Sequence, residues 1–388
     1  MKDHQSNPAD LPANWKAVTV GDICKMYQPK TIGRKEMIDQ GGYPVFGANG
    51  IIGRYHAYNH EEPQLVVGCR GACGAVHITD PFSWITGNTM VIQPISDDID
   101  RDYLEYFFRG SPAVAEAITG TAQPQLTQAS LKPIKIPLPP LEEQKKIVAV
   151  LDQAFAALDR ARASAEANLA DAGELFDSWL TSVFHNHPPS WQTAKLRDLC
   201  RKITVGHVGP MAERYVESGT PFLRSQNVRP FEINLQDVKY IDDVFVGELK
   251  KSELTPGDVA IVRTGYPGTA AVIPDDLIVA NCADLVIART KAHLSPGFLA
   301  LFLNSSFGKN MVAGKVVGAA QKHFNVGAAK EVDFAHPPIE EQERLVQRGL
   351  EMRAASGGIA EHYSKKLADV ADLRQSLLQK SFSGQLAI

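Results

Sequence analysis

The sequence contains few cysteines, no long apolar run and no phosphate-binding loop. Five cysteines in 388 residues are few and odd in number, as expected of free thiols in a reducing compartment. The first residues are too polar for a secretory signal, and no stretch approaches the 18 apolar residues that predict a transmembrane helix. The string Gly-x4-Gly-Lys-Ser/Thr is also missing. We therefore expect a cytoplasmic chain without membrane contact and without a P-loop nucleotide site.

An excess of charge of one sign is missing as well. Lys and Arg number 40 against 44 Asp and Glu, which gives a net charge of −4. This balance argues against DNA binding over the whole surface, but it permits a local basic groove. The apolar fraction of 44% and the charged fraction of 22% are typical of a globular chain. The length predicts two or three domains.

The chain does contain an internal duplication. Residues 14–24 (NWKAVTVGDIC) return as 190–200 (SWQTAKLRDLC), 176 positions later. Residues 139–144 (PPLEEQ) return as 337–342 (PPIEEQ), 198 positions later. The offset grows within the first part of each repeat, so these parts differ by insertions, and it then stays constant. Each repeat is therefore a variable module followed by a constant module.

The variable modules, residues 1–138 and 188–336, carry short β-rich runs such as QLVVGCRG and DVAIVRTG, separated by Gly, Pro and Asn. This pattern predicts a strand-and-loop domain. We expect a few helices in each module, one of them over DRDYLEYFFR in the first and over PGFLALFLN in the second. Four residues that recur at one offset are expected in the core: Trp15, Trp191, Cys24 and Cys200.

The constant modules, residues 139–187 and 337–388, begin with Pro-Pro and then acidic residues, which are helix start signals. Apolar or small residues then recur every three or four positions from Ile147 to Val183, as a heptad seam with one stutter. A helix of about 45 residues is ~65 Å long and needs a partner to bury such a stripe. We expect the two long helices to pair antiparallel, with the variable modules at opposite ends. Two unrelated amphipathic helices that pack locally are the alternative.

The predicted fold class is α+β. It consists of two strand-and-loop domains separated by an antiparallel coiled coil of two long helices, with an internal pseudo-twofold duplication. Gly357 and Gly358 depart from this pattern, because each costs about 1 kcal/mol relative to alanine inside a helix. They predict a kink, a break or a close helix contact in the second long helix.

Three segments carry a resemblance to a known family: IKIPLPPLEEQKKIVAVLD (134–152), VDFAHPPIEEQERLVQRGLE (332–351) and LRQSLLQKSFSGQL (373–386). With these motifs, essentially the whole chain resembles the specificity subunit of a type I restriction–modification enzyme. The resemblance implies two target recognition domains, each reading one half of a split, asymmetric double-stranded DNA sequence. It also implies two methylation subunits that use S-adenosylmethionine and motor-nuclease restriction subunits that use ATP and Mg. No cofactor is expected on this chain itself.

The motifs of the implied chemistry are missing from the chain. An adenine methyltransferase should show a cofactor glycine motif and Asn-Pro-Pro before an aromatic residue, whereas residues 186–190 read NHPPS. We find no convincing set of nuclease carboxylates. We therefore expect a non-catalytic subunit. A coiled-coil structural adaptor without DNA readout is the main alternative, and loops rich in Arg, Asn and Gln argue against it. A stand-alone methyltransferase with degenerate motifs is disfavoured by the missing motifs.

Reading bases needs Arg or Lys for guanine and Asn or Gln for adenine, carried on loops. The Gly-x-x-Gly turns at residues 71–74 and 265–268 let a backbone approach a ligand closely, although such turns can also simply close hairpins. A single exposed cation is often only a solvated surface charge, and the recurring Gln123 and Gln321 can equally mark a packing role. The candidate DNA contacts are Lys30, Arg34, Lys35, Asn49, Arg70, Gln123, Gln125, Arg224, Gln226, Asn227, Arg263, Tyr266, Lys315, Gln321 and Lys322.

Two further features bear on binding. The second variable module is the more basic one, and the first long helix is acidic. Strong phosphate binding needs clustered cations, so we expect weak DNA affinity of the isolated chain, with methylation subunits supplying much of the clamp. The residues His56, His60, Cys69 and Cys73 have a spacing that zinc could use. The second repeat has no equivalent set, so we expect buried thiols and surface histidines there and no metal.

Overall fold

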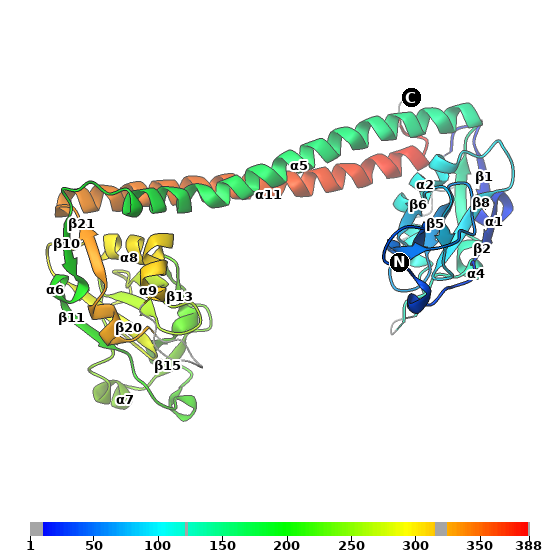
Figure 1. Cartoon of the computed structure of the whole chain (residues 1–388). Coiled ribbons are helices and arrows are strands. Elements are labelled where there is room, and N and C mark those ends of the chain that lie inside the picture. Colours follow the sequence, from blue (N-terminus) through cyan, green and yellow to red (C-terminus); the bar gives the residue numbers. More distant parts are fainter. Residues whose placement is uncertain (1–10, 121–122, 315–323, 387–388) are drawn as a thin grey trace. The chain divides into compact units, whose positions relative to one another are not determined.

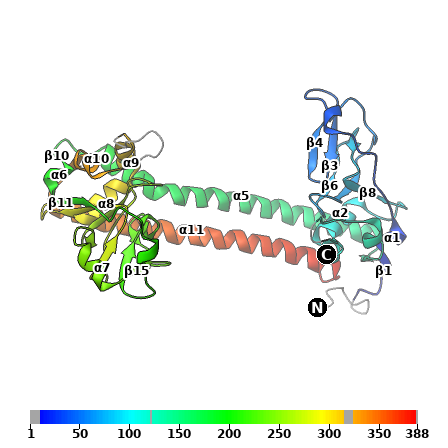
Figure 2. The ribbon, with the colours of Figure 1, turned by 90° about the horizontal axis from the view of Figure 1, so that it is seen from below.

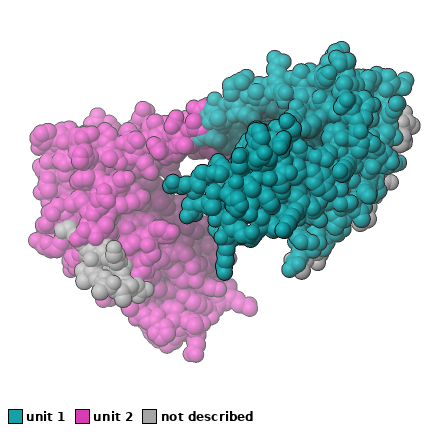
Figure 3. Space-filling view, turned by 45° about the vertical axis from the view of Figure 1, so that its right-hand side comes forward, with its two compact units in different colours: residues 1–166, 365–388 teal, residues 167–364 magenta. Residues whose placement is uncertain are grey.

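The computed structural model describes residues 11–120, 123–314 and 324–386. The chain divides into two compact units (Figure 3). Unit 1 comprises Met1–Glu166 and Lys365–Ile388, and unit 2 comprises Ala167–Ser364. Each unit therefore combines one variable module with a part of both long helices. In the described ranges, no helix is both long and apolar enough to cross a membrane.

Unit 1 is built from short strands and short helices. Its strands are β1 (Lys16–Thr19), β2 (Cys24–Tyr27), β3 (Tyr43–Gly47), β4 (Gly50–Tyr55), β5 (Leu65–Gly68), β6 (Val76–Ile78), β7 (Trp84–Ile85), β8 (Thr89–Pro94) and β9 (Lys135–Leu138). Its short helices are α1 (Val20–Ile23), η2 (Arg34–Glu36), α2 (Arg101–Gly110), α3 (Pro112–Glu116) and α4 (Gln128–Leu131). The sheets have the orders β2-β8-β5-β6, β4-β3-β7 and β1-β9, and β3 pairs with β7 in parallel.

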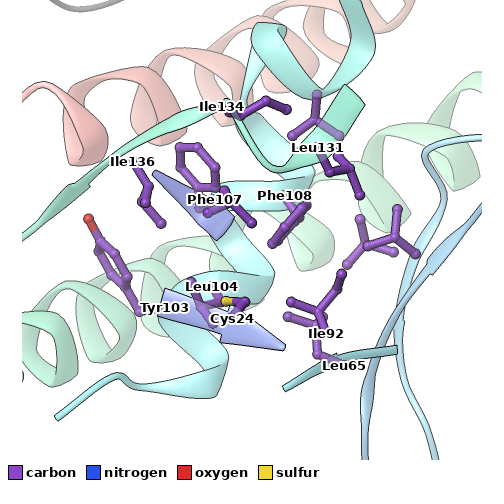
Figure 4. Close-up of a cluster of buried hydrophobic side chains, with 14 of the residues drawn as sticks. Cys24, Leu65, Ile92, Tyr103, Leu104, Phe107, Phe108, Leu131, Ile134 and Ile136 are labelled. Carbon is purple, nitrogen blue, oxygen red and sulfur yellow. The ribbon is translucent and has the colours of Figure 1, made fainter. Parts of the chain in front are cut away.

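One apolar cluster holds unit 1 together. Strands of the four-stranded sheet present alternate side chains to one face, and α2 covers that face with its apolar side. The buried hydroxyl of Tyr103 donates a hydrogen bond to the Pro137 carbonyl at 2.7 Å, so this polar atom is satisfied. The centre of the cluster is formed by Cys24, Leu65, Ile92, Tyr103, Leu104, Phe107, Phe108, Leu131, Ile134 and Ile136 (Figure 4).

Unit 2 repeats this plan. Its strands are β10 (Gln192–Lys195), β11 (Cys200–Val205), β12 (Thr220–Leu223), β13 (Val228–Arg229), β14 (Glu232–Ile233), β15 (Lys239–Ile241), β16 (Glu253–Leu254), β17 (Val259–Val262), β18 (Ala270–Val272), β19 (Ala280–Cys282), β20 (Leu285–Thr290) and β21 (Asp333–His336). Its short helices are α6 (Leu196–Leu199), η3 (Ala212–Arg214), η4 (Ser225–Asn227), α7 (Asp243–Glu248), α8 (Pro296–Asn304), α9 (Ser306–Ala313) and α10 (Val326–Lys330). The order β11-β20-β17-β18 matches β2-β8-β5-β6, and β12 pairs in parallel with β19 as β3 does with β7.

The predicted duplication is confirmed, and the structure locates the main insertion. β3 begins at Tyr43 and its counterpart β12 at Thr220, which is 177 residues later. β5 begins at Leu65 and its counterpart β17 at Val259, which is 194 residues later. The extra residues of unit 2 thus lie between β12 and β17, where the hairpin β13–β14 and the helix α7 are found. The four recurring residues Trp15, Trp191, Cys24 and Cys200 are buried as predicted.

The two long helices are α5 (Leu141–His185) and α11 (Ile339–Phe382). In unit 1 the first part of α5 lies beside the last part of α11 (Figures 1 and 2). Ile147 shares a buried cluster with Phe382, whereas Phe155, further along α5, lies 4.3 Å below the guanidinium of Arg374, further back on α11. Contacts that advance along one helix while retreating along the other make the pair antiparallel. The prediction of an antiparallel pair is confirmed.

The buried stripe of α5 differs in part from the predicted heptad seam. Ala161 was expected in the seam but is exposed, whereas Phe155 and Phe184 lie outside the expected positions and are buried. The reason is that α5 packs on the modules as well as on α11. The ring of Phe155 meets Tyr106 of α2 at 5.4 Å between centroids, and Phe184 meets Phe302 of α8 at 5.5 Å. The helix therefore buries a wider stripe than an isolated coiled coil needs.

The glutamine of each PPxEEQ motif ties a long helix to its module. Gln144 is fully buried, its Nε2 donates to the carbonyls of Asp98 (3.0 Å) and Pro139 (2.8 Å), and its Oε1 accepts from the Asp100 N–H (2.8 Å). Asp100 is the N-cap of α2, so one side chain joins the start of α5 to the start of α2.

Gln342 repeats this junction in unit 2. Its Nε2 donates to the carbonyls of His293 (3.0 Å) and Pro337 (2.8 Å), and its Oε1 accepts from the N–H of Ser295 (2.9 Å), the N-cap of α8. The recurring motif thus has a structural cause: one buried amide satisfies three backbone groups in each unit.

The helix α11 continues through Gly357 and Gly358 without a break. A Cβ added at either position would meet nothing within 4 Å, so close helix packing does not require glycine there. The predicted break and the predicted close contact are therefore wrong, because the solvent-facing side of a paired helix tolerates glycine without any packing role.

Removing the junction amide should destabilise each unit. Gln144→Ala or Gln342→Ala leaves a buried N–H and two carbonyls without partners, and we expect the free energy of unfolding to fall by about 1–3 kcal/mol. Urea unfolding followed by circular dichroism measures the change. Gln153→Ala, on an exposed position of the same α5, is the control. If it costs as much as Gln144→Ala, the junction has no special role.

Replacing the two helix-interior glycines should stabilise the protein. We expect Gly357→Ala and Gly358→Ala each to raise the free energy of unfolding by about 1 kcal/mol, because alanine loses less backbone entropy on helix formation. Gly349→Ala in the same helix is the contrasting variant, since its Cβ would lie 3.0 Å from Leu301 and 3.2 Å from Trp179. Thermal unfolding should rank Gly349→Ala below the wild type. A loss of stability in Gly358→Ala would contradict this account.

Candidate nucleic-acid interface

The two Gly-x-x-Gly turns close equivalent hairpins in the two units. In unit 1 the turn joins β5 to β6, where the Gly68 N–H donates to Ala75 O at 2.7 Å and the Gly74 N–H donates to Gly68 O at 2.9 Å. In unit 2 the turn joins β17 to β18, with the matching bonds from Val262 to Thr269 O (2.8 Å) and from Gly268 to Val262 O (3.0 Å). The same backbone geometry thus occurs twice with different side chains.

Glycine is required at two positions of each turn. Gly71 and Gly265 both have φ of 81°, and Gly74 and Gly268 have φ of 81° and 92°, a region that side-chain-bearing residues rarely adopt. At Gly74 and Gly268 an added Cβ would also approach Ile118 to 3.3 Å and Val312 to 3.2 Å. The turns therefore close hairpins, as one interpretation of the sequence held, and they also hold the residues between the glycines at the tip.

A later segment of each module attaches to the base of its hairpin. In unit 1 the Leu126 N–H donates to Cys69 O at 3.0 Å, and Arg70 and Gln125 form an isolated β-bridge. In unit 2 the Phe324 N–H donates to Arg263 O at 3.1 Å, the equivalent bond. The structure thus brings Arg70 and Gln125 together. The candidates Lys315, Gln321 and Lys322 lie outside the described residues.

Side chains at and beside the two turns are accessible. In unit 1, Arg70 directly before the turn and Gln123 on the later segment are exposed. In unit 2 Tyr266 lies between the turn glycines. It is 83% exposed, the highest value for a large apolar side chain among the described residues. A ring as exposed as this one packs little against the described residues of its own unit. It is suited to contact another molecule.

Arg263 has a different environment from the one expected. Its side chain is only 15% exposed, and its Nη1 pairs with Asp284 Oδ1 at 2.7 Å. Asp284 also accepts from the Thr264 hydroxyl at 2.9 Å. The guanidinium is therefore committed to fixing the turn beside Tyr266. Sequence reasoning missed Asp284 as a positioning residue, because it lies 21 positions after Arg263, just before β20.

The segment after β12 holds three candidates, of which one is buried. Asn227 is 1% exposed. Its Oδ1 accepts a hydrogen bond from the Arg224 N–H at 3.1 Å, and its Nδ2 donates to Asn234 O at 3.0 Å. Because the Asn227 side chain is buried, it is not placed to contact a base as expected. It holds the turn between Arg224 and Asn234 instead. Arg224 donates to Asp237 O at 2.8 Å, so its head group is also engaged, whereas Gln226 is exposed.

The remaining candidates lie on separate loops of unit 1. Asn49 is exposed at the β3–β4 turn, which lies against the β5–β6 hairpin, since a Cβ on Gly68 would come within 2.9 Å of Ala48 O. Lys30 is exposed, and its carbonyl accepts from Trp84 Nε1 at 3.3 Å. The other two candidates, Arg34 and Lys35, lie in η2 and are exposed as well.

The histidines and cysteines with zinc-like spacing are engaged with protein groups. His60 Nε2 bonds the Tyr27 hydroxyl at 2.8 Å, and the Cys73 thiol donates to Pro124 O at 3.0 Å. Burial raises the pKa of the Cys69 thiol to about 11, which disfavours the thiolate that a metal needs. Within the described residues no three His, Cys, Asp or Glu side chains are grouped so that they could hold a metal.

Parts of the chain are similar in sequence to known proteins. Residues 12–167 match the family model of the type I restriction modification DNA specificity domain. The chain is 25% identical over 327 residues to the EcoBI specificity subunit of Escherichia coli, covering 74% of the chain and 66% of that subunit. It is 27% identical over 277 residues to the EcoKI specificity subunit of strain K12, covering 66% and 59% respectively. The matches thus span less than two thirds of these two relatives.

Longer matches include one archaeal relative and two solved structures. The MjaVIII specificity subunit of Methanocaldococcus jannaschii is 23% identical over 371 residues, covering 87% of this chain and 86% of that one. A chain from a study of complex assembly in the type I R-M system superposes with a TM-score of 0.75 at 20% identity, covering 97% and 99%. The HsdS subunit from Thermoanaerobacter tengcongensis superposes with a TM-score of 0.60 at 19% identity, covering 97% and 98%. The likeness to these structures concerns the fold.

Proposed function

We propose that the chain is a specificity subunit of a type I restriction–modification system and that it reads the DNA target of such an assembly. The observation that carries the proposal is the repeated hairpin. One backbone design, with glycines at equivalent positions, carries the exposed Arg70 directly before the turn of unit 1 and the exposed Tyr266 within the turn of unit 2. A shared frame with unlike exposed side chains suits two half-sites of different sequence, and hence a bipartite, asymmetric target.

Hairpin tips are of a size that the DNA major groove accepts, and that groove distinguishes all four base pairs. Arg70 is suited to guanine, and the amides of Gln123 and Gln226 are suited to adenine. Tyr266 offers a ring that can contact a thymine methyl group or stack on a sugar. Lys30, Arg34 and Lys35 are suited to phosphate contacts that set orientation without reading sequence. Arg263, Arg224 and Asn227 would hold these elements in place.

The proposed subunit performs no chemistry itself. In the assembly we propose, two methylation subunits carry S-adenosylmethionine and modify adenine, and restriction subunits use ATP and Mg to cleave unmodified DNA. The acidic α5 and the modest charge of the modules would leave much of the phosphate binding to those partners. A cytoplasmic location, where the five cysteines stay as free thiols, agrees with the free thiols of the structure.

The decisive experiment exchanges one module. Residues 1–138 are replaced by the equivalent module of another family member, and methylated adenines are mapped in the DNA of cells that express the chimaera with its methylation subunits. We expect one half of the recognised sequence to change and the other half to stay. Unchanged methylation would favour the alternative of a coiled-coil adaptor without DNA readout, and loss of both halves would contradict independent reading.

Individual contacts can be tested on the assembled methyltransferase. Arg70→Ala and Tyr266→Ala should each weaken binding to the cognate duplex by about 1–3 kcal/mol, while binding to unrelated DNA changes little. Fluorescence anisotropy at fixed salt measures both affinities. Arg348→Ala, an exposed cation on α11 with 62% of its side chain accessible, is the control. Equal losses for cognate and unrelated DNA would assign Arg70 to the phosphate backbone.

A further inference from the structure

The same groove occurs in both units but is filled in only one of them. In each unit it lies between the edge strand of the four-stranded sheet, the helix that follows that sheet, and the two long helices. In unit 1 it forms a cavity of about 1020 Å³ lined by residues that include Val76, Tyr106, Asp152, Phe155 and Arg374. In unit 2 the equivalent cavity is about 210 Å³ and is lined by the counterparts Leu301, Leu350, Arg353 and Phe176, with Phe231 as an addition.

Phe231 belongs to the insertion that unit 1 lacks. It sits at the tip of the β13–β14 hairpin with φ of 67°. Its ring lies 5.5 Å from that of Phe176 on α5, and the guanidinium of Arg353 on α11 lies 5.3 Å from its centroid. The neighbouring Glu232 pairs with Arg353 at 3.9 Å. A tight turn with an aromatic residue followed by a carboxylate thus closes the groove of unit 2.

The turn also satisfies the edge strand. The Phe231 N–H donates to Ala270 O at 3.0 Å, and Asn304 Nδ2 donates to the same carbonyl at 2.7 Å. Ala270 corresponds to Val76 of β6, because both residues directly follow the hydrogen-bonded pair that closes their hairpin. By the alternation of an antiparallel ladder, the N–H and C=O of Val76 also point outward. Within the described part of unit 1, no turn covers them.

The groove of unit 1 has the chemistry to receive such a turn. Arg374 stacks 4.3 Å over Phe155, and its Nη1 pairs with Asp159 at 2.6 Å, yet 39% of its side chain stays exposed. A guanidinium with an accessible face can take an aromatic ring and a carboxylate together, as Arg353 does in unit 2. The outward C=O of Val76 offers the acceptor that Ala270 offers to Phe231. An unpaired sheet edge beside an open groove is a ready template for a docking segment.

We propose that the groove of unit 1 is a docking site for a turn of a partner protein that carries an aromatic residue followed by an acidic residue. The groove of unit 2, filled by Phe231 and Glu232, shows how such a turn would bind in unit 1. The partner's ring packs against Arg374 and Tyr106, its backbone N–H bonds Val76 O, and its carboxylate pairs with Arg374. The asymmetry makes this a site of unit 1 alone, and it stands independently of any reading of DNA.

The test uses the full chain and a peptide copy of the natural plug. The probe is a fluorescein-labelled peptide with the sequence of residues 226–235, cyclised through added terminal cysteines so that the hairpin is preformed. We expect saturable binding by anisotropy with a dissociation constant below about 1 mM. Alanine in place of the residue copied from Phe231 should weaken binding at least about tenfold, because the buried ring is the anchor.

Matched variants of the chain locate the binding. Arg374→Ala should weaken peptide binding about two- to fivefold, and Arg348→Ala should leave it unchanged. Hydrogen exchange should show peptide-induced protection in residues 152–159 and 367–378. No saturation at 1 mM peptide, equal binding of the alanine peptide, or protection confined to residues 346–353 would each overturn the proposal. Intact DNA recognition alongside any of these results would leave the proposed function untouched.

Discussion

The buried glutamine of each PPxEEQ motif is the interaction on which the rest of the architecture depends. Gln144 and Gln342 each satisfy three backbone groups where the start of a long helix meets the start of a short helix. A buried amide with every hydrogen bond made tolerates little rotation, because any shift leaves polar groups without partners. This side chain therefore helps to fix the orientation of each module on its long helix, together with the aromatic contacts that α5 makes with α2 and α8.

The two units show how a duplicated design diverges. The hairpin turns keep glycines with the same positive φ values, since no other residue adopts this backbone cheaply and closely packed side chains exclude a Cβ at Gly74 and Gly268. Between those glycines the side chains are free to differ, and they do. On the long helices the aromatic residue and the arginine have changed places between the repeats. Phe155 corresponds to Arg353, and Arg374 corresponds to Phe176. The insertion of unit 2 places Phe231 between the exchanged pair.

The candidate interface was predictable in its framework and less so in its residues. The loops around the glycine turns were expected, and Arg70, Gln123, Gln226 and Tyr266 are accessible there. Arg263 and Asn227 have the residue types of base-reading side chains but are committed within the fold, one to Asp284 and one to the backbone around Asn234. Residue type and loop position do not reveal such commitments, because the partners come from other strands or from beyond a turn.

The sequence by itself determined the duplication, the two long helices and the turns, because apolar periodicity, proline starts and glycine punctuation are local signals. It also predicted that the helices pair, since so long an apolar stripe cannot stay in water. The tertiary structure alone decided which face of α5 is buried, because that face packs against α2 and α8 as well as against α11. It alone decided that one groove is filled and the other open, because Phe231 reaches its site only once the β13–β14 hairpin has folded across the edge of β18.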